Sequence, residues 1–287
     1  MGTRSRGTAV GVEVGKKKVF ASALDWPGWS RSGKTEEEAL AALGAYLPRY
    51  AVVADRAGIA LPARAAQAFD VVERLDGDGG TDFGVPGKVA RAETEPTTRA
   101  SAARLAALVT GAWTVFDEVV VTAPAELRKG PRGGGRDRDK IVAHVLEAET
   151  SYARVIGIRL QPPAIDDVDA IEAQREAIAT ALATPSPGPV DKGWPVRYAA
   201  RRIAWHVVDH AWEIQDRAEP ANAEPADELP AGLSAPARRA LEGAGYQRLD
   251  QLAGTTERAL LDLHGMGPKA IRLLREAMSA RGLELSG

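Results

Sequence analysis

Between residues 98 and 217 the chain carries four consecutive segments with the periodicity of amphipathic helices. In the first segment, Leu105, Leu108 and Val109 recur at the i, i+3 and i+4 spacing of one helix face. Four such helices in succession are typical of an antiparallel bundle. We therefore predict a four-helix bundle whose helices span 102–121, 139–152, 166–182 and 195–217.

The residues before this bundle predict a small domain over 1–93 that starts with a β-hairpin. Two apolar runs, 10–14 and 19–24, flank a turn of one glycine and three lysines. Runs of this kind, joined by a short turn, pair as antiparallel strands. Two later apolar runs, 69–72 and 83–89, are predicted as additional strands.

A helix is predicted directly after the hairpin. Glu38 follows Thr35 at the spacing of a capping box, which marks a helix N-terminus. The helix is expected to run through Leu47 and to end before Pro48. This β-β-α order, with the sequence ALDWPGWSRSGKTEEEALAAL at 23–43, resembles the small HicB-like antitoxin fold.

The composition changes after the bundle. Residues 218–230 are rich in Ala, Glu and Pro and are predicted to form a linker, whereas 231–287 are predicted to form a compact helical module. A length of 287 residues suits two or three domains. The predicted fold class is therefore multidomain α+β, with an N-terminal β-β-α domain, an antiparallel four-helix bundle and a C-terminal helix-hairpin-helix module.

The absence of cysteine excludes several kinds of site. Disulfide frameworks, thiolate zinc sites, iron–sulfur clusters and cysteine nucleophiles are ruled out, so any metal must bind His, Asp or Glu. The formal net charge is −2, and neither an apolar run of about 18 residues nor a signal peptide is present. We therefore expect a soluble, cytoplasmic protein without a membrane partner.

Histidine is rare in this chain, and three of its four copies fall within the predicted bundle. His206 and His210 are four residues apart on the last helix, so their imidazoles project from one face and suit a single metal ion. His144 lies on the second helix, and a bundle can bring facing helices together until three imidazoles converge. The alternative is that these are surface histidines or hydrogen-bonded core histidines.

Residues 98–219 resemble the DinB-like metalloproteins. The matching sequences are RDKIVAHVLEAE, which contains His144, and RRIAWHVVDHAWEIQDR, which contains His206 and His210. The resemblance implies that these three histidines bind one divalent metal ion, with zinc or nickel expected. Three protein ligands leave an open position, as in catalytic sites, where the ion can activate a water or a thiol.

The same resemblance implies a thiol-dependent transferase. The chain contains 28 Arg and 9 Lys with abundant Ala, which is typical of high-GC genomes such as those of actinobacteria, where mycothiol would be the thiol. Glu147 and Glu213 each lie one turn beyond a proposed ligand and are candidate catalytic bases or orienting groups. Solvated helix charges are the alternative for both. Trp205 and Trp212 are expected to anchor the core, with a pocket wall as the alternative.

The C-terminal residues contain a second motif. The sequence LLDLHGMGPKAI at 260–271 resembles a helix-hairpin-helix, and with the preceding GLSAPARRALEGAGYQRLDQLAG it resembles the C-terminal domain of the bacterial RNA polymerase α subunit. The resemblance implies DNA-backbone contact through Gly265, Gly267, Lys269 and Arg272. His264 begins the hairpin and is expected to be a capping or packing residue and not a metal ligand.

The net charge of this module favours DNA binding only mildly. Residues 231–287 contain eight basic and six acidic side chains, a net charge of +2. The expected partner is duplex DNA, with protein docking by the same module and a homodimer of the chain as alternatives.

Two classes of function follow. The first is a DNA-associated, divalent-metal-binding protein of the DinB-like type, favoured because two of the three segments resemble DNA-linked modules. The alternative is a metal-dependent transferase or hydrolase of that type, in which the C-terminal module is accessory. The three histidines without an evident fourth protein ligand favour this alternative.

Overall fold

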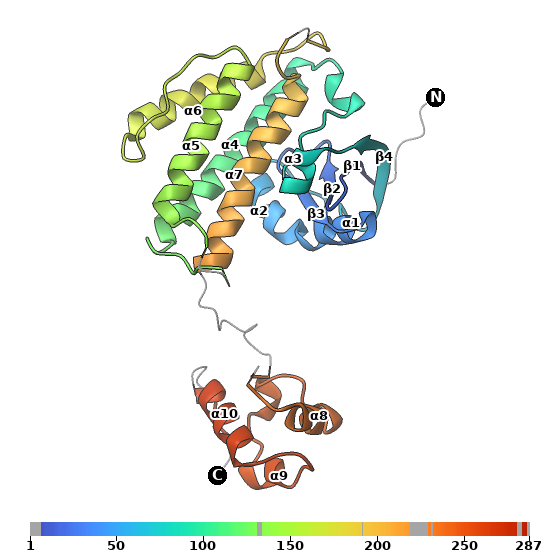
Figure 1. The fold of residues 1–287 in the computed structure, drawn as a ribbon, viewed down its shortest axis with the longest axis vertical. Coiled ribbons are helices and arrows are strands. Elements are labelled where there is room, and N and C mark those ends of the chain that lie inside the picture. The colour runs from blue at the N-terminus through green and yellow to red at the C-terminus, as the bar shows by residue number, and fades with distance from the viewer. Residues whose placement is uncertain are drawn as a thin grey trace. The chain divides into compact units, whose positions relative to one another are not determined.

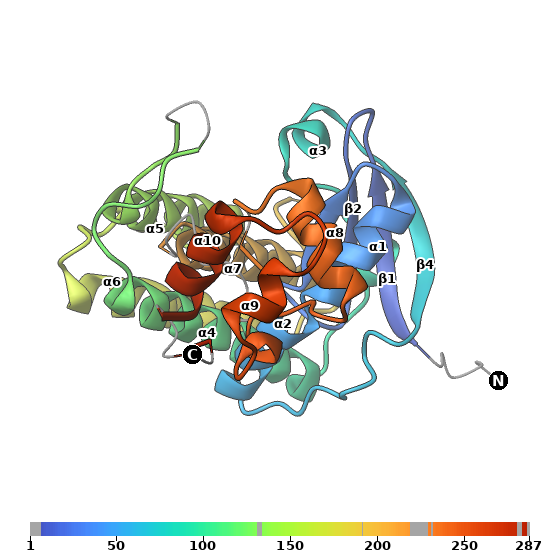
Figure 2. The same cartoon turned by 90° about the horizontal axis from the view of Figure 1, so that it is seen from below.

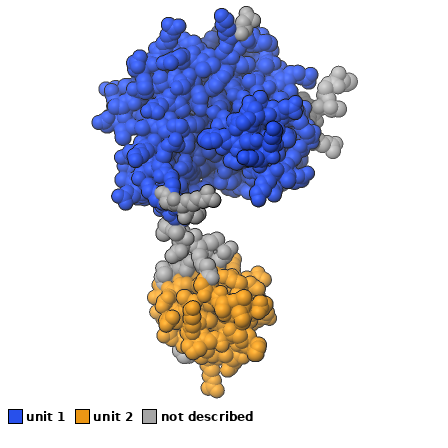
Figure 3. Space-filling model, viewed as in Figure 1, with its two compact units in different colours: residues 1–218 blue, residues 219–287 orange. Residues whose placement is uncertain are grey.

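The computed structural model describes residues 7–130, 134–190, 192–218, 229–230, 232–279 and 283–285. The chain divides into two compact units, residues 1–218 and 219–287, coloured separately in Figure 3. Most of the predicted linker, 219–228, lies outside the described residues.

The protein is mixed α+β, as predicted: a four-stranded N-terminal sheet is followed by helices (Figure 1). The N-terminal elements are β1 (Thr8–Val14), β2 (Val19–Ala23), β3 (Ser30–Gly33), α1 (Glu36–Ala45), α2 (Leu47–Arg56), β4 (Phe69–Asp76), α3 (Gly79–Phe83) and the 3-10 turn η1 (Arg91–Thr94). The long helices are α4 (Arg99–Thr122), α5 (Arg138–Val155), α6 (Val168–Ala183) and α7 (Val196–Ala218). The second unit contains α8 (Ala235–Gly243), the 3-10 turn η2 (Asp250–Leu252), α9 (Glu257–Leu261) and α10 (Pro268–Ser279).

The sheet has the strand order β3-β2-β1-β4. The predicted hairpin is present, since β1 and β2 pair antiparallel with Val10 opposite Ala23. The strand predicted over 69–72 is the start of β4, which pairs parallel to β1. The strand predicted over 83–89 is wrong: Phe83 ends the short helix α3, and the backbone then turns through Gly84, whose φ is +122°.

The predicted N-terminus of α1 is present, but its predicted end is wrong. The Thr35 hydroxyl accepts a hydrogen bond from the Glu38 amide at 3.2 Å, as an N-cap does. The helix ends at Ala45, and Pro48 lies in the first turn of a second helix, α2, where its missing N–H removes no intrahelical hydrogen bond.

Each of the four segments predicted to be helical after residue 98 contains a helix, α4 to α7. Helix α4 packs against α2, α6 and α7, and Figures 1 and 2 show the sheet and the long helices side by side. Among the described residues, α4 is the one helix long and apolar enough to cross a membrane, but 56% of its most apolar window is buried inside the protein. That burial is typical of a core helix.

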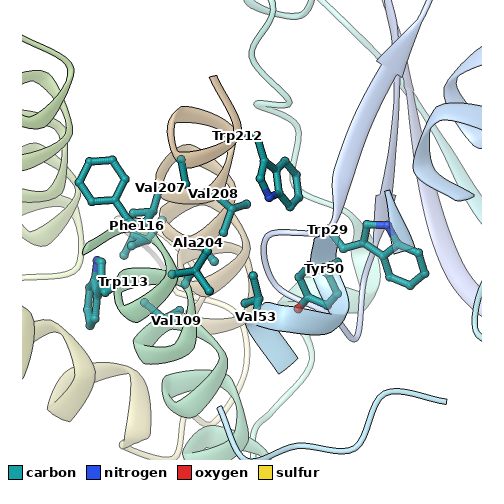
Figure 4. Packing of buried hydrophobic residues seen from close by; sticks show 14 of the residues in the cluster. Trp29, Tyr50, Val53, Val109, Trp113, Phe116, Ala204, Val207, Val208 and Trp212 are labelled. Carbon is teal, nitrogen blue, oxygen red and sulfur yellow. The ribbon is translucent and has the colours of Figure 1, made fainter. Parts of the chain in front are cut away.

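One hydrophobic core joins the sheet side of the first unit to its long helices (Figure 4). Trp29 and Tyr50 stack with ring centroids 5.4 Å apart, and Trp113 of α4 and Trp212 of α7 belong to the same core. Gly111 of α4 permits this close packing, because a Cβ there would lie 2.5 Å from a backbone oxygen of α2. The segments predicted as separate domains, 1–93 and 98–217, therefore share one core.

The second unit has its own core. Leu241 of α8, Leu260 of α9 and Leu274 of α10 are fully buried together with Leu252. The unit therefore has the separate hydrophobic interior expected of a folded module.

Candidate metal centre

His144, His206 and His210 come together in the structure. His144 extends from α5, and the other two extend from adjacent turns of α7. Their ring centroids are 4.7 to 5.1 Å apart, and one potential ligand nitrogen from each lies within 4.8 Å of the others. The three side chains can therefore hold one metal ion.

The spacing of the nitrogen atoms suits a small divalent ion. Nε2 of His206 lies 3.3 Å from Nε2 of His144. Two nitrogen ligands at about 2.0–2.1 Å from a tetrahedral zinc ion are themselves roughly 3.3 Å apart. The rings of His144 and His206 thus already have the separation that a shared ion requires.

Burial keeps two of these imidazoles in the form that binds metal. His206 is 8% exposed, and burial lowers the pKa of its imidazole to about 2. Burial also lowers the pKa of His144. Since only a neutral imidazole has a free lone pair, both rings are ready to bind a metal ion at neutral pH.

Glu213 orients the third histidine. Its Oε2 lies 2.8 Å from Nδ1 of His210, while Oε1 accepts a hydrogen bond from Arg217 at 2.6 Å. The hydrogen bond with His210, assisted by that of Arg217, holds the pKa of Glu213 below its usual range. A charged carboxylate at Nδ1 leaves Nε2 of His210 as the nitrogen that is free to bind a metal ion.

The two glutamates proposed from the sequence have different surroundings, since only Glu213 contacts a histidine. Glu147 is exposed on α5, and its closest link to the centre is the effect of its charge on the pKa of His144.

Three other residues near the histidines have structural roles. Asp209, which lies between the two α7 histidines in sequence, pairs with Arg31 at 2.8 Å. Trp205 and Trp212 are 4% and 2% exposed, so both are buried anchors as predicted.

Sequence reasoning missed two residues beside the centre. The Tyr152 ring lies 5.6 Å from that of His206, and Arg202 stands one helical turn before His206 on α7. The α-helical spacing of four residues between Arg202 and His206 was the available signal.

The residues of the second unit that were expected to contact DNA lie around the start of α10. Gly265 has a φ of +106°, and a Cβ there would lie 2.8 Å from the Pro236 carbonyl oxygen, so this glycine is required by the turn itself. A Cβ at Gly267 would meet no atom within 4 Å. Lys269 and Arg272 are exposed, and His264 is exposed in the turn before α10.

A scan against models of known families, a search of curated proteins and a search of solved structures each found no match to this chain.

Replacing Glu213 with alanine should weaken metal binding by about 10- to 100-fold, the usual effect of removing a carboxylate that orients a histidine ligand. The measurement is a competition titration of the full chain against a chromophoric chelator. Glu147→Ala is the matched control, because it removes the same charge near His144 without removing a contact. Equal losses in both variants would mean that Glu213 acts only through general electrostatics.

Proposed function

We propose that this chain is a metal-dependent enzyme of the DinB-like type, in which residues 98–217 form an antiparallel four-helix bundle. The observation that carries the proposal is the convergence of His144, His206 and His210 from two helices, with two ring nitrogens already 3.3 Å apart. Chance surface histidines need no such convergence. A fully hydrogen-bonded core histidine would have partners on both ring nitrogens, whereas Nδ1 of the buried His206 has none among the described residues.

The ligand set favours a catalytic centre over a closed structural one. Within the described part of the chain, the group that can hold the ion contains three residues and no fourth ligand. Imidazole ligands suit zinc and nickel among the divalent ions. Bound there, such an ion supplies Lewis-acid chemistry. The chain's own contribution is to hold three imidazoles in place, with Glu213 fixing the orientation of His210.

The reaction class that we propose is group transfer with a thiol co-substrate such as mycothiol, with hydrolysis as the alternative. The test uses tag-free full chain prepared without chelator and then loaded with cobalt. About one equivalent of metal should bind. Addition of mycothiol, with glutathione for comparison, should produce the near-ultraviolet charge-transfer band of a thiolate bound to cobalt. Metal binding without a thiol band would favour hydrolysis, and an absence of metal binding would remove the enzyme proposal.

DNA contact through residues 231–287 is the second function that we propose, with these residues as a helix-hairpin-helix module. It is supported by the open space beside Gly267 and by the exposed Lys269 at the start of α10. It ranks second because other basic side chains of the module are engaged: Arg275 pairs with Glu257, and Arg248 pairs with Asp250. These pairs reduce the positive charge available to phosphate.

Binding to duplex DNA should be weak, with a Kd on the order of 10 to 100 μM at physiological salt, and should weaken further as salt rises. Gly267→Leu should reduce it by blocking the approach of a phosphate, and Lys269→Glu should reduce it through charge. A fluorescence-anisotropy titration would compare the full chain, these variants and a chain ending at Pro230. If the shortened chain binds equally well, or if the full chain does not bind at low salt, the module docks a protein or has a structural role.

A further inference from the structure

A buried arginine without an acidic partner lies beside the metal centre. Arg202 is 8% exposed, and none of the described residues forms an ion pair or a hydrogen bond with its guanidinium. Its Nη1 atom is fully buried. The other buried charged side chains of the first unit are hydrogen-bonded, namely Glu13, Glu93, Glu149 and Arg201. Because a buried donor without an acceptor is costly, especially on a charged group, a molecule outside the chain is the candidate acceptor for Nη1.

Aromatic rings flank this guanidinium. Its Cζ atom lies 4.7 Å from the ring centroid of Trp205 and 5.2 Å from that of Tyr152. Such contacts attract the positive charge but accept none of its N–H groups in the guanidinium plane. The buried Nη1 atom of Arg202 is therefore still without an acceptor.

Two neighbouring groups lack acceptors in the same way. Nε1 of Trp205 and Nδ1 of His206 are also buried without a hydrogen-bond partner. Arg202, Trp205 and His206 occupy positions i, i+3 and i+4 of α7, so they are neighbours on the helix surface. When Nε2 of His206 binds a metal ion, Nδ1 carries the proton, and all three groups are then donors. A water molecule can accept such hydrogen bonds, but it does not neutralise the charge of Arg202.

We propose that Arg202 binds the carboxylate of a small-molecule ligand at the metal centre, with Tyr152 and Trp205 as apolar walls. This inference rests on the proposed function, because it assigns the substrate class of that same site. Tyr152 connects the proposed carboxylate site to the metal centre, since its ring contacts both Arg202 and His206. A guanidinium fork matches a carboxylate, and one guanidinium balances one negative charge, whereas a phosphate group carries nearly two.

The first test measures ligand binding by the metal-free full chain. Acetate, propionate, benzoate and inorganic phosphate are added at constant ionic strength, and thermal unfolding is followed by tryptophan fluorescence. All six tryptophans belong to residues 1–218, so the signal reports on this unit alone. At saturation a carboxylate should raise the midpoint by about 3 °C or more, and phosphate should raise it less. A larger effect of phosphate, or no saturable effect of any carboxylate, would overturn the assignment.

The second test uses Arg202→Met. Since the substitution removes a buried charge that has no partner, the midpoint should stay unchanged or rise, while the shift caused by carboxylate disappears. Arg99→Met is the matched control: it removes an exposed charge on α4 and should leave the shift intact. A markedly lower midpoint in Arg202→Met with the carboxylate shift retained would make Arg202 a structural residue. If Arg202→Met does not fold, Arg202→Lys replaces it, with at least a tenfold weaker carboxylate affinity expected and an unchanged affinity contradicting the proposal.

Metal content, measured on the same samples, distinguishes the two proposals. Arg202→Met should still bind about one equivalent of cobalt, because none of the three histidines is changed. If the carboxylate shift persists in a chain that binds no metal, the enzyme proposal fails and the carboxylate site stands. If metal binds and the carboxylate shift is absent, the enzyme proposal stands and the carboxylate site fails.

Discussion

His206→Ala should abolish stoichiometric metal binding, with a loss of affinity greater than about 100-fold. This exceeds the 10- to 100-fold expected for an orienting carboxylate such as Glu213, because His206 contributes a ligand atom itself. His206 also lies beside both other imidazoles: its Nε2 is 3.3 Å from that of His144, and its ring centroid is 4.7 Å from that of His210. Without it, two nitrogens from different helices remain, too few to compete with solvent for the ion.

The measurement is metal content after dialysis, together with a competition titration, on tag-free full chain. His264→Ala is the matched control, because His264 is the fourth histidine of the chain and lies exposed in the other unit. Metal should also stabilise the native protein by about 2.7 kcal/mol at a free concentration 100-fold above its Kd, and this increment should vanish in His206→Ala. Unchanged stoichiometry in His206→Ala, or an equal loss in His264→Ala, would remove the triad from the proposed centre.

The three histidines of the candidate metal centre could be predicted because helical geometry determines much of their arrangement. Once 195–217 was predicted to be a helix, the four-residue spacing placed His206 and His210 on one face. The approach of α5 to α7, which brings His144 to them, was expected from the general packing of a helix bundle and from a family resemblance, and no periodicity specifies it. Spacing also could not show which of Glu147 and Glu213 contacts a histidine ring. Each stands one turn beyond a histidine, and the difference lies in which side chain is exposed and which meets a ring nitrogen.

Other features escaped prediction because they depend on packing between distant segments. Pro48 is compatible with a helix end and with a first helical turn, and only the surrounding structure distinguishes these. The parallel pairing of β4 with β1 and the core shared by Trp29 and Trp212 have no local sequence signature. Arg202 was missed for a related reason: its spacing from His206 places it near the centre, but only the folded structure shows that its buried Nη1 atom has no partner.

Arg201→Met should destabilise the first unit by roughly 3–5 kcal/mol, the usual cost of removing one partner of a buried ion pair. Arg201 and Glu93 are 3% and 2% exposed, and Nε of the arginine donates to Oε1 of the glutamate at 2.5 Å. The same guanidinium donates to the Lys88 carbonyl at 2.7 Å and to the Pro86 carbonyl at 3.3 Å. The substitution therefore leaves the buried Glu93 carboxylate without its cationic partner, with only the Ala90 amide, among the described residues, still donating to it at 2.8 Å, and removes a donor from two carbonyls.

The measurement is urea unfolding followed by tryptophan fluorescence, which reports on residues 1–218 alone. The double variant Arg201→Met with Glu93→Leu should recover much of the loss, because removing both charges of a buried pair is often nearly neutral. Arg202→Met provides the sharpest contrast: the two arginines are adjacent on α7 and similarly buried, yet only Arg201 has an acidic partner. The same substitution should therefore be strongly destabilising at position 201 and neutral or stabilising at position 202. Equal losses at the two positions would show that packing of the side-chain stems, and not pairing of the charge, decides stability here.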